Sequence, residues 1–311
     1  MAKPTPLQTK VLRTLGEWHS LARELAEPAS RSGRRGGRDR SVETTEDIDT
    51  LVSTLEALER LASAAGVPEA WVREVADSAR AGLIWHPGVA LPKPAVRADR
   101  ATVLAGLRDD WSKLRWYTGV DAAAHRLGLH AEDPTTAESV EFVMAAMWRR
   151  SVAAARLAGV SGAEPKTLWG DTGAWVRAAA ADSARLDPAR ISAEWRSAAR
   201  SPYGWDYGWE AIAADEAGIR LTRTRAFTPP TRPRELVALI TTELDTAEPG
   251  AGTAIDAADL GGAARDLPGN DPTSQATFSH ASAPHAPITV ENLENDTGTT
   301  EFIQPDDGYW L

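Results

Sequence analysis

The chain lacks cysteine altogether. Disulfide bridges, thiolate zinc sites, iron–sulfur clusters and cysteine nucleophiles are therefore excluded. It also lacks any apolar run near the roughly 18 residues that a membrane-spanning helix requires. Residues 1–20 form a mixed amphipathic stretch, without the apolar core and small-residue cleavage site of a secretion signal. We therefore expect a cytoplasmic protein that does not engage a membrane.

The sequence motifs that carry common chemistry are missing as well. HExxH, GxGxxG and GxxxxGK[ST] do not occur, and the nearest imitation of a phosphate loop, residues 162–167, lacks its second glycine. His125 and His130 lie five positions apart, which does not bring two ligands onto one helix face. We therefore interpret the two histidines as surface or capping residues. The alternative is a metal site that also uses the nearby Glu132 and Asp133. We expect no enzymatic activity, no cofactor and no metal.

The composition favours helix. The chain holds 29 Arg against 5 Lys and is rich in alanine, whereas the β-formers valine and isoleucine are scarce. Apolar residues recur at helical spacing over residues 7–25 and 48–62, and Pro68 suits the first turn of a third helix. The sequence predicts a helical hairpin or three-helix unit over residues 1–82, in which a flexible connector, 28–43, begins at a proline that ends the first helix.

The same helical spacing continues after a proline-rich connector over residues 83–97. Residues 98–246 are predicted to form a helical bundle, because apolar positions repeat every three or four residues and no convincing strand alternation appears. Together with the N-terminal unit this gives an all-α fold of about seven helices or more.

Several helix ends are marked by local signals. Thr135 to Glu138 fits the capping-box spacing and predicts a helix start, and Asp171 and Asp187 each suit an N-cap. Gly119, within the predicted helix that begins near residue 99, is expected to weaken its continuation.

The charge is segregated toward the C-terminus. Residues 242–311 hold 13 Asp and Glu against one basic residue, whereas the rest of the chain is nearly neutral. Such a segment cannot offset its ordering entropy by burial, so residues 247–311 are predicted to be a disordered acidic tail. We expect the last residues of this tail to form a tip that binds a partner, similar in form to the acidic tails of single-stranded-DNA-binding proteins. The alternative is that these residues have no function. The tip consists of Asp306, Asp307, Tyr309, Trp310 and Leu311.

Arginine-rich segments support a second function, the binding of nucleic acid. Residues 58–77 have helix-turn-helix spacing with Gly66 in the turn, but Glu69 and Glu74 on the exposed face disfavour phosphate. Two packed helices joined by a turn are the favoured interpretation there. A second segment of this kind is 209–227, for which a plain basic loop is the alternative. The candidate residues are Arg31, Arg34, Arg35, Arg38, Arg40, Arg73, Arg220, Arg223, Arg225, Arg232 and Arg234.

A tandem repeat, YGWD followed by YGWE, occupies residues 203–210. Its aromatic residues recur one helical turn apart, and Gly204 and Gly208 would let another helix approach closely. Base stacking or a cofactor site is one interpretation. Packing in the core and between helices is the favoured one, because aromatic stripes on helices are usually buried.

As a whole, the chain resembles uncharacterised helical proteins of plasmids and phages in actinobacteria. The resemblance rests on the stretch AGVPEAWV, residues 65–72, and on general composition, and it implies no activity. We therefore expect a non-enzymatic accessory or adaptor protein that binds a protein partner, with the C-terminal tip as an anchor acting either in cis or in trans. The alternative is a DNA-binding accessory protein whose basic segments are modulated by the acidic tail. The sequence does not indicate an oligomeric state.

Overall fold

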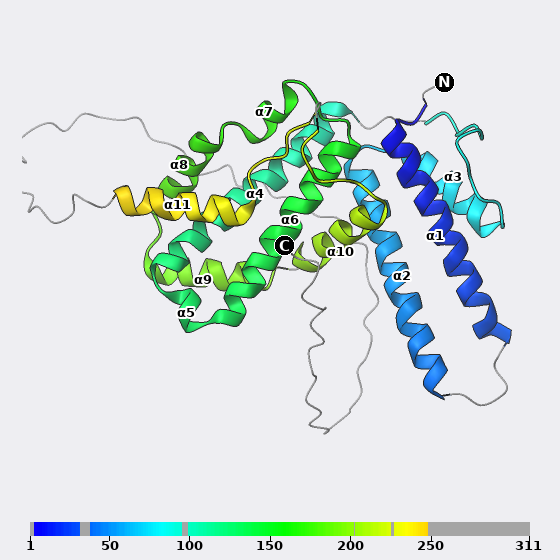
Figure 1. The fold of residues 1–311 in the computed structure, drawn as a ribbon, viewed down its shortest axis with the longest axis horizontal. Helices are drawn as coiled ribbons and strands as arrows, with labels where there is room; N and C mark the ends of the chain where they lie inside the picture. Colours follow the sequence, from blue (N-terminus) through cyan, green and yellow to red (C-terminus); the bar gives the residue numbers. More distant parts are fainter. Residues whose placement is uncertain (1–2, 32–37, 95–98, 202, 225–226, 248–311) are drawn as a thin grey trace, which may run out of the picture. The chain divides into compact units, whose positions relative to one another are not determined.

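The fold was obtained as a computed structural model. It describes residues 3–31, 38–94, 99–201, 203–224 and 227–247, without the side chains of residues 27–47, 203 and 247. Within these ranges the secondary structure is helix without any strand, which confirms the predicted all-α fold (Figure 1). The predicted acidic tail and its tip lie outside the described residues.

Helices account for most of the described residues. They are α1 (Pro6–Arg31), α2 (Arg38–Ala64), α3 (Glu69–Arg80), α4 (Arg100–Arg126), α5 (Leu129–Glu132), α6 (Pro134–Leu157), α7 (Glu164–Trp169), α8 (Thr172–Ser183), α9 (Pro188–Ala199), α10 (Tyr203–Glu216) and α11 (Pro233–Ala247).

Helices α1, α2 and α3 pack together around the predicted apolar stripes. Leu12 and Leu15 of α1 and Leu58 and Leu61 of α2 are fully buried. Burying each such leucine contributes about 1.5–3 kcal/mol relative to leaving it in water. Helix α3 lies mainly against α1, and its contact with α2 is slight.

The connector between α1 and α2 is shorter than the sequence suggested. Helix α1 continues through Pro28 to Arg31, and α2 begins at Arg38 rather than at residue 44 or 45. Proline removes one backbone donor and crowds the preceding turn, but only three residues of α1 follow it. The proline therefore destabilises only the last turn of α1, and the helix continues past it.

Helices α4 and α6 form the centre of the remaining fold. Helix α6 contacts α10, α4, α9 and α2, while α4 also contacts α8, α9 and α11. Trp195 of α9, Met147 of α6 and Ile240 of α11 are buried in this core. Because α2 contacts both α6 and α10, the N-terminal helices pack directly onto the bundle. Whether residues 1–82 fold as a separate unit stays a prediction.

The proline-rich stretch after α3 is irregular where it is described, as predicted. The side chain of Trp71 ties it to α3, since its Nε1 donates to the carbonyl oxygen of Pro92 at 2.9 Å. The buried Trp85 anchors the same stretch in the core.

The aspartate caps are confirmed, but the predicted capping box is wrong. Asp171 and Asp187 accept hydrogen bonds from the third backbone amide after each of them, and they start α8 and α9. Helix α6 begins earlier than Thr135, because Asp133 caps it by accepting from the backbone amide of Thr136 at 3.1 Å. Pro134 then occupies the first helical turn, where no amide donor is needed.

Gly119 does not weaken α4, which continues to Arg126. A Cβ at this position would lie 2.6 Å from Ser183 Oγ and 3.0 Å from the carbonyl oxygen of Ala179. The glycine is therefore a packing residue that lets α8 approach the backbone of α4.

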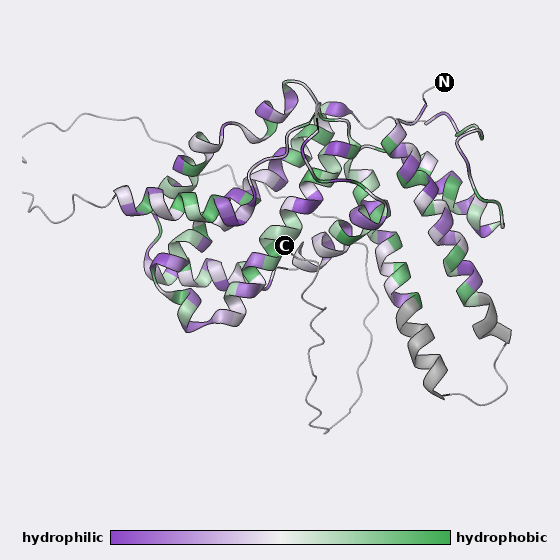
Figure 2. Cartoon of the chain, in the orientation of Figure 1, coloured by the Kyte–Doolittle hydropathy of each residue, from purple (hydrophilic) through white to green (hydrophobic). Residues whose placement is uncertain are grey.

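Apolar and polar residues alternate in short stretches along the helices (Figure 2). Across the described ranges, no helix combines the length and hydrophobicity needed to cross a membrane.

Candidate functional site

Helix α10 carries the tandem repeat, and residues of the repeat lie on two different faces of the helix. With about 100° between successive residues, the first tryptophan and Ile212 fall on one face, opposite Tyr207 and Glu210. Tyr207 and Glu210 are buried, whereas Trp205 is 68% exposed. The favoured prediction of core packing thus holds for Tyr207 and is wrong for Trp205.

The two glycines of the repeat do allow close packing, as predicted. A Cβ at Gly204 would lie 2.7 Å from Val143 Cγ2, and one at Gly208 would lie 3.2 Å from Phe142 Cζ. Both neighbours belong to α6, with which α10 makes its most extensive contact.

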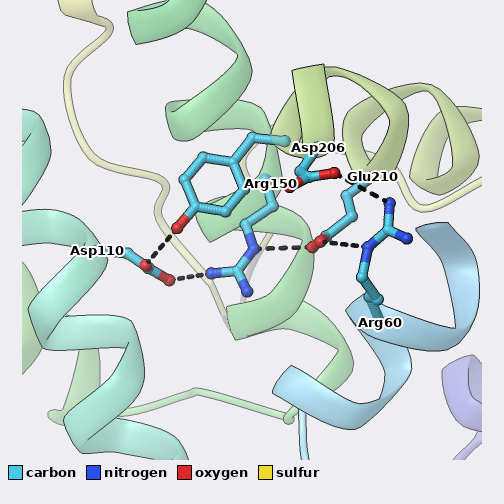
Figure 3. Close-up of polar contacts among 6 residues, drawn as sticks. Arg60, Asp110, Arg150, Asp206 and Glu210 are labelled. Carbon is cyan, nitrogen blue, oxygen red and sulfur yellow. Dashed lines mark hydrogen bonds and ion pairs between the residues drawn. The ribbon is translucent and has the colours of Figure 1, made fainter. Parts of the chain in front are cut away.

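The inward face of α10 ends in a buried network of charged groups (Figure 3). The Tyr207 hydroxyl donates to Asp110 Oδ1 at 3.1 Å, and Arg150 forms ion pairs with both Asp110 and Glu210. Arg150 Nε lies 2.9 Å from Glu210 Oε2, and the guanidinium group lies over the Tyr207 ring at 4.8 Å. The side chains of Arg150 and Glu210 are only 11% and 4% exposed.

Arg60 extends this network to α2 and to the surface. Its Nε lies 3.4 Å from Glu210 Oε1, and its Nη2 lies 3.7 Å from Asp206 Oδ1 (Figure 3). Residues from α2, α4, α6 and α10 therefore meet in one set of contacts, which we name the Arg150 network: Arg60, Asp110, Arg150, Asp206, Tyr207 and Glu210. It fixes the position and rotation of α10.

The electrostatics of the network follow from its burial. Burial raises the pKa of the Glu210 carboxyl, and the guanidinium groups of Arg150 and Arg60 oppose that rise. Burial and then the Asp110 charge raise the pKa of the Tyr207 hydroxyl. Burial lowers the pKa of Arg150, but the charges of Asp110 and Glu210 outweigh it and raise the pKa overall. Arg150 is therefore a permanent cation in this network.

The outward face of α10 is apolar. Trp205, Trp209 and Ile212 fall within about 60° of one another around the helix. Ile212 is 39% exposed, Trp209 is half-buried, and Phe142 of α6, beside Gly208, is 41% exposed. We name these four residues the α10 stripe. The exposed acids Asp206, Asp215 and Glu216 lie on the same helix.

Of the two predicted helix-turn-helix segments, only residues 58–77 form two helices joined by a turn, and DNA binding by them stays a prediction. Helix α3 packs mainly on α1, and Arg73 on its exposed face is paired with Glu69. The interpretation of residues 58–77 as two helices joined by a turn therefore accounts for their geometry. The second segment is wrong as a helix-turn-helix, because residues 219–224 and 227–232 are not helical.

The remaining predicted arginines are scattered. Arg220 and Arg223 are exposed before α11, Arg234 is exposed on α11, and Arg232 lies over the Trp148 ring at 6.0 Å. The other predicted site residues lie outside the described side chains: Arg31, Arg34, Arg35, Arg38, Arg40, Arg225, Asp306, Asp307, Tyr309, Trp310 and Leu311.

His125 and His130, considered above as possible metal ligands, belong to a cluster of ring contacts around Asp121. His130 Nε2 and Trp195 Nε1 both lie 2.9 Å from the same oxygen, Oδ1 of the buried Asp121. The rings of His130 and Trp195 stack at 5.3 Å, and His125 contacts His130 edge-on at 5.2 Å. The hydrogen bond to the carboxylate of Asp121 raises the pKa of His130. No group of side chains in the described ranges is arranged to hold a metal ion.

The chain finds no match among known protein families, characterised proteins or solved structures. Its function must therefore be argued from its own sites. Sequence reasoning missed the Arg150 network, because Arg60, Asp110, Arg150 and Glu210 are far apart in the chain and form no local pattern.

Proposed function

We propose that the protein is a non-enzymatic helical adaptor that binds a protein partner, and that the α10 stripe is a contact surface for that partner. The observation that carries this proposal is the exposure of Trp205, at 68% the most exposed of the large apolar side chains described. Tryptophan is enriched at the energetic centres of protein interfaces, where its large apolar area is removed from water.

The geometry beneath the stripe supports a role in binding. Helix α10 is held by the Arg150 network on its inward side, so the outward side chains rest on an element whose position is fixed (Figure 3). A surface fixed before binding loses less conformational entropy when the partner arrives. Three or more apolar side chains on one rigid helix face therefore present a preorganised surface.

The charges around the stripe favour a basic partner over a second copy of the chain. Asp206, Asp215 and Glu216 are exposed on α10, and Glu138 and Glu141 are exposed near Phe142 on α6. In a symmetric dimer these acids would meet their own copies, and like charges across an interface are unfavourable. A partner with an apolar groove and a rim of Lys and Arg complements the surface.

The C-terminal tip remains a second proposed anchor, on the strength of its sequence alone. Tyr309, Trp310 and Leu311 place a large apolar area next to two carboxylates at the end of the chain. Short aromatic motifs of this kind bind partners with modest affinity.

Pull-down from the native host tests the proposal. The bait is the full-length protein, compared with Trp205→Ser, with a matched control, Leu239→Ser, which changes another exposed apolar residue on α11, and with a chain that ends at residue 247. We expect Trp205→Ser to weaken capture of a specific partner by about tenfold or more and Leu239→Ser to leave it unchanged. Equal capture by both variants would contradict a role for the α10 stripe, and loss only on truncation would assign the contact to the tail.

A further inference from the structure

An open groove lies between α7, the start of α8 and the segment that follows Phe227. It has a volume of about 730 Å³, which is typical of ligand-binding clefts. None of the α10 stripe residues lines it. Its lining residues are Ser161, Gly162, Pro165, Lys166, Trp169, Gly170, Thr172, Phe227, Thr228, Pro229, Pro230 and Thr231.

The lining combines aromatic surface, hydroxyl groups and positive charge. Lys166 is exposed, and none of the lining residues is acidic, although the chain carries a net charge of −10. Trp169 is half-buried and meets Phe227 edge-on, with ring centroids 5.9 Å apart. Two acidic residues lie next to lining residues in the chain, and both have partners: Glu164 forms an ion pair with Arg100, and Asp171 caps α8.

An arginine adds positive charge beside Phe227, one of the lining residues. The guanidinium group of Arg156 lies over the Phe227 ring at 5.6 Å and donates to the carbonyl oxygens of Arg220 and Thr222. Among the described residues no carboxylate forms an ion pair with Arg156, and the charge of the exposed Arg220 acts on it. Arg223 is also exposed and directly follows Thr222 in the chain. Burial, and to a smaller extent the charge of Arg220, lower the pKa of Arg156.

We propose that this groove binds single-stranded nucleic acid. The phosphates would follow Lys166, Arg220 and Arg223, and a base would enter the groove against Trp169. Proteins bind single strands through this combination of cationic track and aromatic stacking surface. A single strand fits better than a duplex, because only unstacked bases can enter a cleft, and the segment beside it, residues 219–224, is not a helix that could lie in a major groove.

The same cations would also attract an acidic peptide that carries an aromatic residue, and the two ligands differ in a measurable way. A strand places a phosphate on each cation, so its affinity falls steeply and linearly on a logarithmic plot against salt. A base stacked on Trp169 adds a contribution that salt does not screen. An aromatic peptide would share that contribution, so a direct comparison of oligonucleotide with peptide separates the two ligands.

The experiment measures fluorescence anisotropy of fluorescein-labelled oligo(dT), oligo(U) and a DNA duplex with the full-length protein, from about 25 to about 200 mM salt. We expect the single strands to bind more tightly than the duplex. The Arg220→Ala/Arg223→Ala variant should weaken binding about tenfold at low salt and reduce the salt slope by about 0.7 for each phosphate that is no longer neutralised. Trp169→Leu should weaken binding about tenfold with the slope unchanged, and Trp169→Phe should retain most of it.

The matched control is Arg13→Ala/Arg80→Ala, which removes one exposed arginine each from α1 and α3. It should bind single strands as the wild type does. Circular dichroism and thermal melting establish that each variant is folded. The proposal is overturned if no single strand binds at low salt, if the control weakens binding as much as the groove variant, or if only an acidic peptide of residues 300–311 binds. None of these outcomes bears on the protein partner of α10, which the pull-down tests separately.

Discussion

One guanidinium group, that of Arg150, holds together contacts from several helices. It pairs with Asp110 of α4 and Glu210 of α10 while lying over the ring of Tyr207. Taking charges out of water is costly, and their mutual attraction compensates only when every member of the network is present. Removing one member of the network should therefore destabilise the protein by more than its ion pair stabilises it, because a buried charge is left without a partner.

We expect Arg150→Ala to lower the free energy of unfolding by about 3–5 kcal/mol, because it leaves the buried Asp110 without its cation and Glu210 with Arg60 alone. The matched control, Arg73→Ala, breaks an exposed Arg–Glu pair on α3. It should change the free energy of unfolding by less than about 0.5 kcal/mol. Urea denaturation followed by circular dichroism measures both. Similar values for the two variants would contradict the importance assigned to burial.

His130 should make the stability of the fold depend on pH. Its pKa is raised in the folded state, chiefly by the hydrogen bond to Asp121, with a smaller contribution from Glu141. The stabilising contribution of His130 is therefore fully present below the unfolded pKa of about 6.5, and it is lost as the pH rises through the folded value. NMR titration of the His130 ring should give a midpoint above 6.5 that falls in Asp121→Asn. A midpoint unmoved by this substitution would be inconsistent with the assignment.

Two glycines of α4 offer an internal comparison. Gly119→Ala places a Cβ against the backbone of α8 and should destabilise the protein by about 1–3 kcal/mol. Gly106→Ala has nothing within 4 Å and should stabilise it by up to about 1 kcal/mol, through helix propensity alone. Thermal melting of the two variants should therefore shift in opposite directions.

At the scale of the element, the sequence predicted what depends on near neighbours in the chain. The N-caps Asp171 and Asp187 are correct, because a cap is decided within a few residues. Gly119 was misjudged, because its reason lies in a helix some 60 residues later. The repeat shows the same limit: a helical period fixes which residues share a face, but the neighbours of α10 decide which face is buried.

The two faces of α10 should respond differently to substitution. Trp205→Ser should leave the unfolding free energy within about 0.5 kcal/mol of the wild type, because the side chain is exposed. Tyr207→Phe removes the donor to Asp110 and should cost about 1–3 kcal/mol. Chemical denaturation checks both values, and a large loss for Trp205→Ser would show that its ring packs more tightly than its exposure indicates.

For the whole molecule, the all-α class followed from composition and apolar period, since both act locally along the chain. The tertiary arrangement did not follow, because contacts such as those of α2 with α6 and α10 leave no pattern in a single sequence. The candidate sites were predictable only where a charged surface residue stood out in the sequence, as with Arg220 and Arg223, whereas the groove around Trp169 depends on two distant segments.

Removing residues 248–311 should leave the melting temperature and helicity unchanged, because the described core lies wholly within residues 3–247. The truncated chain is also less acidic, so its binding to single strands at low salt should strengthen. Differential scanning calorimetry and the anisotropy titration measure these effects. A fall in melting temperature would mean that the body depends on residues beyond 247.

The pair between Arg60 and Glu210 has a consequence for the order in which the chain is made. A ribosome adds residues at about 5–20 per second, so α2 is complete on the order of ten seconds before α10 emerges. During that interval α2 can pack against α1, α3 and then α6, but its surface for α10 stays open to other proteins. Synthesis therefore exposes an incomplete core for a defined period, and that period ends when Glu210 reaches the guanidinium groups of Arg60 and Arg150.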